Sequence, residues 1–75
     1  MDEPQSRKKF VELAEKRVTR AIKDIRLIGN LSNRSNYTYT EEDVRKIMKA
    51  LKSELDALKT RFESVGGSTD QVFKL

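Results

Sequence analysis

The sequence contains no cysteine and no histidine among its 75 residues. Without cysteine there are no disulfides and no thiolate metal sites, and without histidine the commonest general base and metal ligand are missing. The Asp and Glu residues show no calcium-loop spacing, and no glycine-rich phosphate loop follows a strand. We therefore expect a protein that is not an enzyme and that carries no metal ion and no other cofactor.

Long apolar runs are also missing. No stretch approaches the roughly 20 residues that a membrane-spanning helix needs, and the N-terminal MDEPQSRKKF lacks the apolar segment of a signal peptide. We expect no membrane partner and a cytoplasmic location. In a protein that is not exported, the three Asn-x-Ser/Thr triplets within residues 30–38 match the glycosylation pattern only by coincidence.

The short length and the charge of the chain limit how it can fold. A chain of this size buries a modest fraction of its surface alone, and small folds usually need a disulfide, a metal or a partner subunit. Since the first two are excluded, a homo-oligomer is expected. The net charge of +4 is compatible with an anionic ligand or with nucleic acid, although solvated helix faces explain most of the charged residues.

A first helix is predicted over residues 7–28, after a lead-in of residues 1–6, and a start near Pro4 is the alternative. Its apolar positions alternate spacings of three and four, which is an a/d heptad stripe: Val11, Ala14, Val18, Ala21, Ile25 and Ile28. Further apolar residues flank this stripe, so the apolar arc is wider than a two-helix hairpin needs and predicts a contact with another subunit. Gly29 is predicted to end the helix with a positive φ.

A second helix is predicted over residues 40–65. Thr40 and Asp43 have the spacing of a capping box, and Tyr39 and Val44 that of a hydrophobic staple. Glu42 is expected to pair with Lys46 at i,i+4. The apolar stripe is again regular: Val44, Met48, Leu51, Leu55, Leu58, Phe62 and Val65. Gly66 and Gly67 are predicted to end the helix, and residues 66–75 to form a flexible or docking tail.

Two helices of similar length joined by a polar connection predict an all-α fold. We expect an antiparallel two-helix hairpin, coiled-coil-like, that assembles into a homo-oligomeric bundle.

The connection over residues 29–39 is longer than a hairpin needs. Its asparagines supply donors and acceptors, its tyrosines aromatic faces, and its arginine a forked cation, which together suit a nucleotide-like ligand. The alternative is that Asn and Ser simply form turns with their own backbone. The candidate binding residues are Asn30, Asn33, Arg34, Asn36, Tyr37 and Tyr39.

A second candidate site lies on the first helix. Arg17, Arg20 and Asp24 occupy c and g positions beside the apolar stripe. They are expected either to form interhelical ion pairs that set the register, or, for Arg17 and Arg20, to bind an anion.

Residues 17–47 carry a resemblance to known proteins, strongest in the stretch IRLIGNLSNRSNYTYTEEDV. This stretch resembles small helical proteins encoded by phages, plasmids and other mobile elements. The resemblance implies an accessory role, because such genes often inhibit or evade host defence. It also implies the cytoplasm of the host cell as the location, and it favours a stoichiometric binder over an enzyme.

Three functional hypotheses follow. The first is an oligomeric binding module that sequesters a small anionic nucleotide used as an immune signal. The second is an inhibitor or adaptor that binds a host protein. The third, less favoured, is a nucleic-acid-binding protein that uses its basic face, whose affinity would fall steeply with salt.

Overall fold

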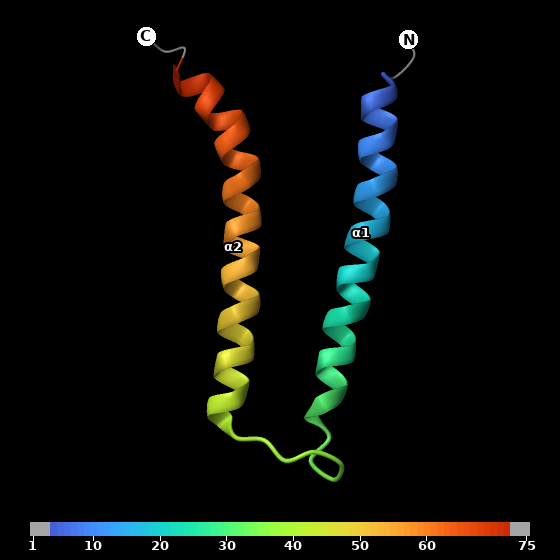
Figure 1. Cartoon of the computed structure of the whole chain (residues 1–75), viewed down its shortest axis with the longest axis vertical. Helices are drawn as coiled ribbons and strands as arrows, with labels where there is room; N and C mark the ends of the chain where they lie inside the picture. Colours follow the sequence, from blue (N-terminus) through green and yellow to red (C-terminus); the bar gives the residue numbers. More distant parts are fainter. Residues whose placement is uncertain (1–3, 73–75) are drawn as a thin grey trace. The chain divides into compact units, whose positions relative to one another are not determined.

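The structure, a computed structural model, describes residues 4–72, with side chains described as far as Ser64. Helix α1 spans Gln5–Gly29, the short 3-10 helix η1 spans Asn30–Ser32, and helix α2 spans Glu41–Val72 (Figure 1). No strand occurs in this described part of the chain. The all-α, two-helix class is confirmed, whereas the antiparallel packing and the homo-oligomer remain predictions.

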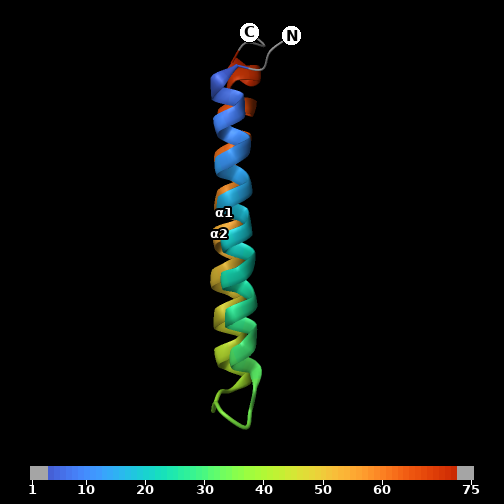
Figure 2. The same ribbon diagram turned by 90° about the vertical axis from the view of Figure 1, so that its right-hand side faces the viewer.

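The chain divides into two compact units, Met1–Thr38 and Tyr39–Leu75. The first contains α1, η1 and the turn that follows, and the second contains α2. Helix α1 is a continuous ribbon in both views of the molecule (Figures 1 and 2), and α2 is seen as a continuous ribbon in Figure 1. Neither helix combines, within its described residues, the length and the apolar character that are needed to cross a membrane.

Helix α1 begins directly after Pro4, whose backbone is extended at φ −62° and ψ 152°. The Pro4 carbonyl accepts hydrogen bonds from the N–H groups of Arg7 and Lys8 at 3.0 and 3.2 Å. Proline suits a helix start because its fixed φ matches the helix and it has no N–H to leave unpaired. The predicted lead-in is therefore too long, since the helix starts at Gln5.

The prediction that Gly29 stops the helix with a positive φ was wrong. Gly29 has φ −59° and ψ −29°, and the chain continues in helical conformation into η1. Glycine permits a positive φ but does not require one. The predicted connection over residues 29–39 is consequently shorter, because its first residues are helical.

Gly29→Ala is expected to stabilise the protein by about 0.5–1 kcal/mol, because alanine has a higher helix propensity and restricts the unfolded chain. A Cβ atom added at Gly29 would meet no heavy atom within 4 Å. Thermal unfolding followed by circular dichroism measures the change. A positive φ at this position would give the opposite sign, so a destabilised variant would contradict the observed backbone.

Helix α2 passes through Gly66 and Gly67 and ends at Val72, so the predicted end at Val65 was also wrong. A glycine inside a helix costs about 1 kcal/mol relative to alanine, which weakens the helix without forbidding it. The first residues of the predicted tail are thus helical. Residues 73–75 lie outside the described part of the chain, as do residues 1–3.

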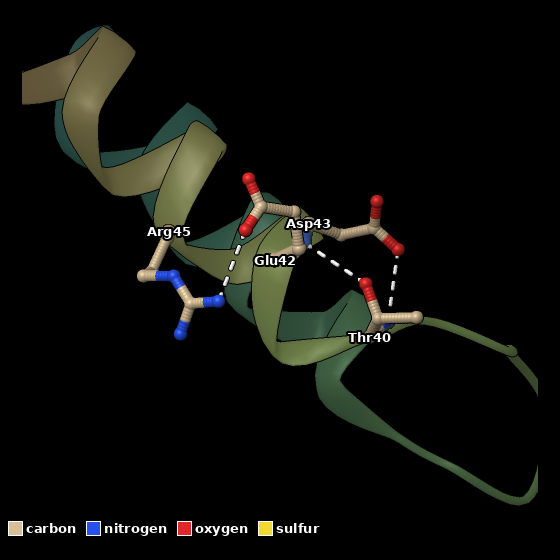
Figure 3. Close-up of polar contacts among 4 residues, drawn as sticks. All are labelled: Thr40, Glu42, Asp43 and Arg45. Atoms are coloured by element: carbon tan, nitrogen blue, oxygen red, sulfur yellow. Dashed lines mark hydrogen bonds and ion pairs between the residues drawn. The ribbon is translucent and has the colours of Figure 1, made fainter.

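The start of α2 confirms the predicted capping box. The Asp43 N–H donates to Thr40 Oγ1 at 3.1 Å, and the Thr40 N–H donates to Asp43 Oδ2 at 2.8 Å (Figure 3). The bond from the Thr40 backbone holds the pKa of the Asp43 carboxyl below its ordinary value, with a further lowering by the bond to the Thr40 side chain. Each residue thereby satisfies an N–H group that the helix itself leaves unpaired.

The least exposed side chains lie mainly on the apolar stripes. Within residues 4–64 no side chain is fully buried, and the half-buried ones are Val11, Leu13, Ala14, Ile28, Tyr39 and Leu51. Four of these six belong to the predicted a/d stripes, but even they keep part of their surface in solvent. Long helices owe most of their stability to the packing of an apolar face, so what covers these stripes matters for the fold, and the partner subunit remains a prediction.

Candidate functional site

One face of α1 carries a cluster of cations around a single apolar side chain. Leu13, Lys16, Arg17 and Arg20 line a shallow hollow that is open to solvent. With 3.6 residues per turn, their spacings of three, four and seven place them on the same side of the helix. The helix period alone therefore brings Arg17 and Arg20 together, as the heptad assignment predicts.

The cations of this hollow make no ion pair or hydrogen bond with the other residues that the structure describes. In the described part of the chain the ion pairs join Glu42 to Arg45 and Lys59 to Glu63, and Lys16, Arg17 and Arg20 make neither an ion pair nor a hydrogen bond. Three unpaired cations on adjacent turns create a local positive potential. An anion with several oxygens can satisfy more than one of them at once, and arginine binds phosphate with two N–H groups.

Sequence reasoning missed Lys16 and Leu13 as parts of this site. Lys16 lies at an f position of the heptad, away from the a/d stripe, and Leu13 lies at a c position that flanks the stripe. The signal that would have found them is the helical spacing from Arg20 back to Leu13. Spacings of three, four and seven residues place Leu13 and Lys16 on the same face as Arg20. The heptad assignment gives these residues different letters and so hides that shared face.

In the connection, the structure gives Asn33 a structural role. Asn33 Oδ1 accepts hydrogen bonds from the Ser35 N–H at 3.0 Å and the Ser35 hydroxyl at 2.9 Å. The Asn33 carbonyl accepts from the N–H groups of Asn36 and Tyr37 at 3.1 and 3.0 Å. This is a local turn built by an asparagine, which was the alternative to ligand binding.

The other predicted residues of the connection belong to different elements of the described chain. Asn30 belongs to η1, and Arg34 and Asn36 lie in the turn after Asn33. Tyr37 is 48% exposed at the end of that turn, whereas the half-buried Tyr39 belongs to the second unit.

The two candidate sites are also separate from each other within the first unit. At a rise of 1.5 Å per residue, Arg20 and Asn30 are about 15 Å apart along the axis of α1. A single small ligand held by Arg17 and Arg20 therefore lies more than two helical turns from the connection of the same chain.

Comparisons with known proteins identify no family for this chain: no family model, no curated protein and no solved structure matches it. The site must therefore be interpreted from its own chemistry. Among the described residues, no group of three or more Asp or Glu side chains is placed to hold a metal ion. The hollow on α1 places positive charge beside an apolar surface, and this combination suits the binding of an anion that also has an apolar part.

Proposed function

We propose that this chain is the subunit of a non-enzymatic, oligomeric binding module that captures a small nucleotide-type anion. The hollow on α1 holds the anion, with Arg17 and Arg20 as the main ligands and Lys16 as a third cation. In the context that the resemblance to mobile-element proteins implies, the captured molecule is an immune signal of the host, and the protein acts against host defence by sequestering it.

The observation that carries this proposal is the combination of three unpaired cations with Leu13 in one hollow. Phosphate groups match the cations, and a flat base or ribose matches the apolar surface of Leu13 and the aliphatic stems of the long side chains. An inorganic anion would use only the first of these features. A nucleotide uses both.

The exposure of the hollow argues for an oligomer as the binding form. Small-molecule sites usually bury most of the ligand surface, and a face of one helix cannot enclose a nucleotide. A second subunit placed over this face supplies the missing wall and excludes water, which strengthens each charged contact.

Isothermal titration calorimetry with a panel of linear and cyclic nucleotides tests the proposal. We expect binding heat from nucleotides that carry phosphate, and none from the matching uncharged nucleosides, because the cations provide the main attraction. A panel that gives no heat at low salt would refute the proposed capture. Binding of mixed-sequence oligonucleotides with a steep salt dependence would instead support the nucleic-acid hypothesis.

A second candidate, the binding of a host protein, is favoured by apolar exposure near the Asn33 turn. Leu31 and Tyr37 are 46% and 48% exposed there, and aromatic and aliphatic side chains of this kind serve as anchors in protein interfaces. This candidate predicts that Tyr37→Ser abolishes recovery of a host protein from lysate while nucleotide heats stay unchanged.

A further inference from the structure

A second stripe of residues runs along the first unit beside the a/d stripe. It again alternates spacings of three and four, starts in the first turns of α1 and ends in η1, and we call it the mixed stripe: Phe10, Leu13, Arg17, Arg20, Asp24, Leu27 and Leu31. Its two ends are apolar and its centre is charged.

The apolar ends of the mixed stripe face solvent. Phe10, Leu27 and Leu31 are 50%, 54% and 46% exposed. At the first end, the Arg7 guanidinium carbon lies over the Phe10 ring, 5.9 Å from its centre. Half of Phe10 nevertheless remains exposed. Large apolar side chains repeated along one face of a helix are typical of a contact surface rather than of isolated exposed residues.

The charged residues at the centre of the mixed stripe form no ion pair with the other described residues of the chain. Asp24 follows Arg20 at i+4, a spacing at which a helix often forms an ion pair. In the described part of the molecule, however, Asp24, Arg17 and Arg20 make neither an ion pair nor a hydrogen bond. Both signs of charge are therefore available to a partner.

We propose that the mixed stripe docks onto the same stripe of a second copy of this chain, with the two α1 helices antiparallel. In that orientation Phe10 and Leu13 of one copy meet Leu27 and Leu31 of the other. At the centre, Arg17 of each copy meets Asp24 of its partner, and the two Arg20 side chains lie on either side of the two-fold axis. The surface is complementary to itself under a two-fold rotation, as an isologous dimer requires.

The charge pattern decides the orientation. A parallel pair would place each centre residue beside its own counterpart, so arginine would face arginine and Asp24 would face Asp24. Like charges across a helix pair destabilise it, and opposite charges select partner and direction. The antiparallel pair joins Arg17 to Asp24 on both sides of the axis, leaves only Arg20 beside its own counterpart, and keeps the apolar ends in contact.

The centre of this dimer keeps a positive charge, because each copy brings Arg17 and Arg20 but only Asp24 as an acid. A bound anion would neutralise this excess, and the second copy would supply part of its site. The inference rests on the proposed function in this respect, since it names the partner that completes the hollow. Self-association itself, however, is measured without any nucleotide.

Paired charge reversals test the contact. Asp24→Arg makes the centre of every copy fully cationic, and the double variant Arg17→Asp, Arg20→Asp makes it fully anionic. Sedimentation equilibrium should show at least a tenfold weaker self-association for each variant alone, and a mixed dimer when the two are combined. Asp56→Arg, outside the apolar stripe of α2, changes the net charge by the same amount as Asp24→Arg and should associate like the unchanged protein.

The mixture also shows that each variant still folds, because a misfolded chain would form no dimer with its complement. Unchanged association of both variants, or the absence of a mixed dimer, would overturn the proposal. If the mixed dimer forms but the unchanged protein binds no nucleotide, the proposed function alone is contradicted. A mixed dimer that fails to form while the unchanged protein still binds nucleotide would count against the docking alone.

The orientation has its own test, since the sequence contains no other thiol. Chains carrying Phe10→Cys and chains carrying Leu31→Cys are mixed and oxidised, and the disulfide-linked dimers are weighed by mass spectrometry. The antiparallel arrangement predicts dimers that join the two different variants. A product dominated by dimers of identical chains would overturn the antiparallel arrangement.

Discussion

A chain with Arg17→Gln and Arg20→Gln will bind the captured nucleotide about 100-fold more weakly than the unchanged protein. A hydrogen bond to a charged group contributes about 1.5–3 kcal/mol, and the lower value is appropriate here because both side chains are open to solvent. Two such losses amount to about 3 kcal/mol, or roughly two powers of ten in Kd. Glutamine keeps the polar character and the helix propensity, so the fold should be retained.

The matched control is Lys23→Gln with Arg26→Gln, which removes the same charge from the polar face of the same helix. If the two double variants lose affinity equally, the general charge of the protein holds the ligand, and the hollow has no special role. Because Arg17 and Arg20 also belong to the mixed stripe, both variants should be titrated at protein concentrations where sedimentation shows the same oligomer as in the unchanged protein.

A chain with Leu51→Asp and Leu55→Asp will lose most of its helical circular-dichroism signal. Both residues belong to the apolar stripe of α2, and each charge would sit in the helix contact that this stripe predicts. An unpaired carboxylate in such a contact costs several kcal/mol. That is comparable with the whole free energy of unfolding of a small protein, about 5–15 kcal/mol.

Ser53→Asp with Thr60→Asp is the control for this experiment, since it adds two carboxylates to the same helix on the side away from the stripe. It should retain the helical signal and unfold at nearly the same temperature. An unaltered signal in the Leu51/Leu55 variant would mean that the stripe makes no packed contact, and the predicted bundle would be wrong.

The parts of the structure that the sequence predicts well are those decided within a few residues. The capping box of Thr40 and Asp43 is correct because both of its bonds join residues three apart. The face shared by Arg17 and Arg20 is correct because the helical period fixes it.

The ends of the helices were predicted less well, for a common physical reason. Gly29, Gly66 and Gly67 were each taken to end a helix, and each is helical. Glycine makes a helix less stable at its position, but it does not determine where the helix ends. Glu42 shows a similar limit: it pairs with Arg45 at 3.0 Å rather than with Lys46, since both spacings place a cation on the same helix face (Figure 3).

The candidate site could be predicted only in part. Its arginines follow from periodicity, but only the length of α1 shows that they and the connection of the same chain are too far apart to hold one small ligand. A list of polar residues contains no information about the distance between them. The role of Asn33 depended on the hydrogen bonds of a specific turn, which the composition of the segment cannot distinguish from a ligand-binding loop.

The local character of the Asn33 turn and the Thr40 cap has a consequence for the order of folding. Their hydrogen bonds join residues at most four apart, and contacts this close along the chain form within about a microsecond. Meeting a second chain, in contrast, is slower and depends on concentration. We therefore expect refolding to show a fast phase that is independent of protein concentration, followed by an association phase whose rate rises with it.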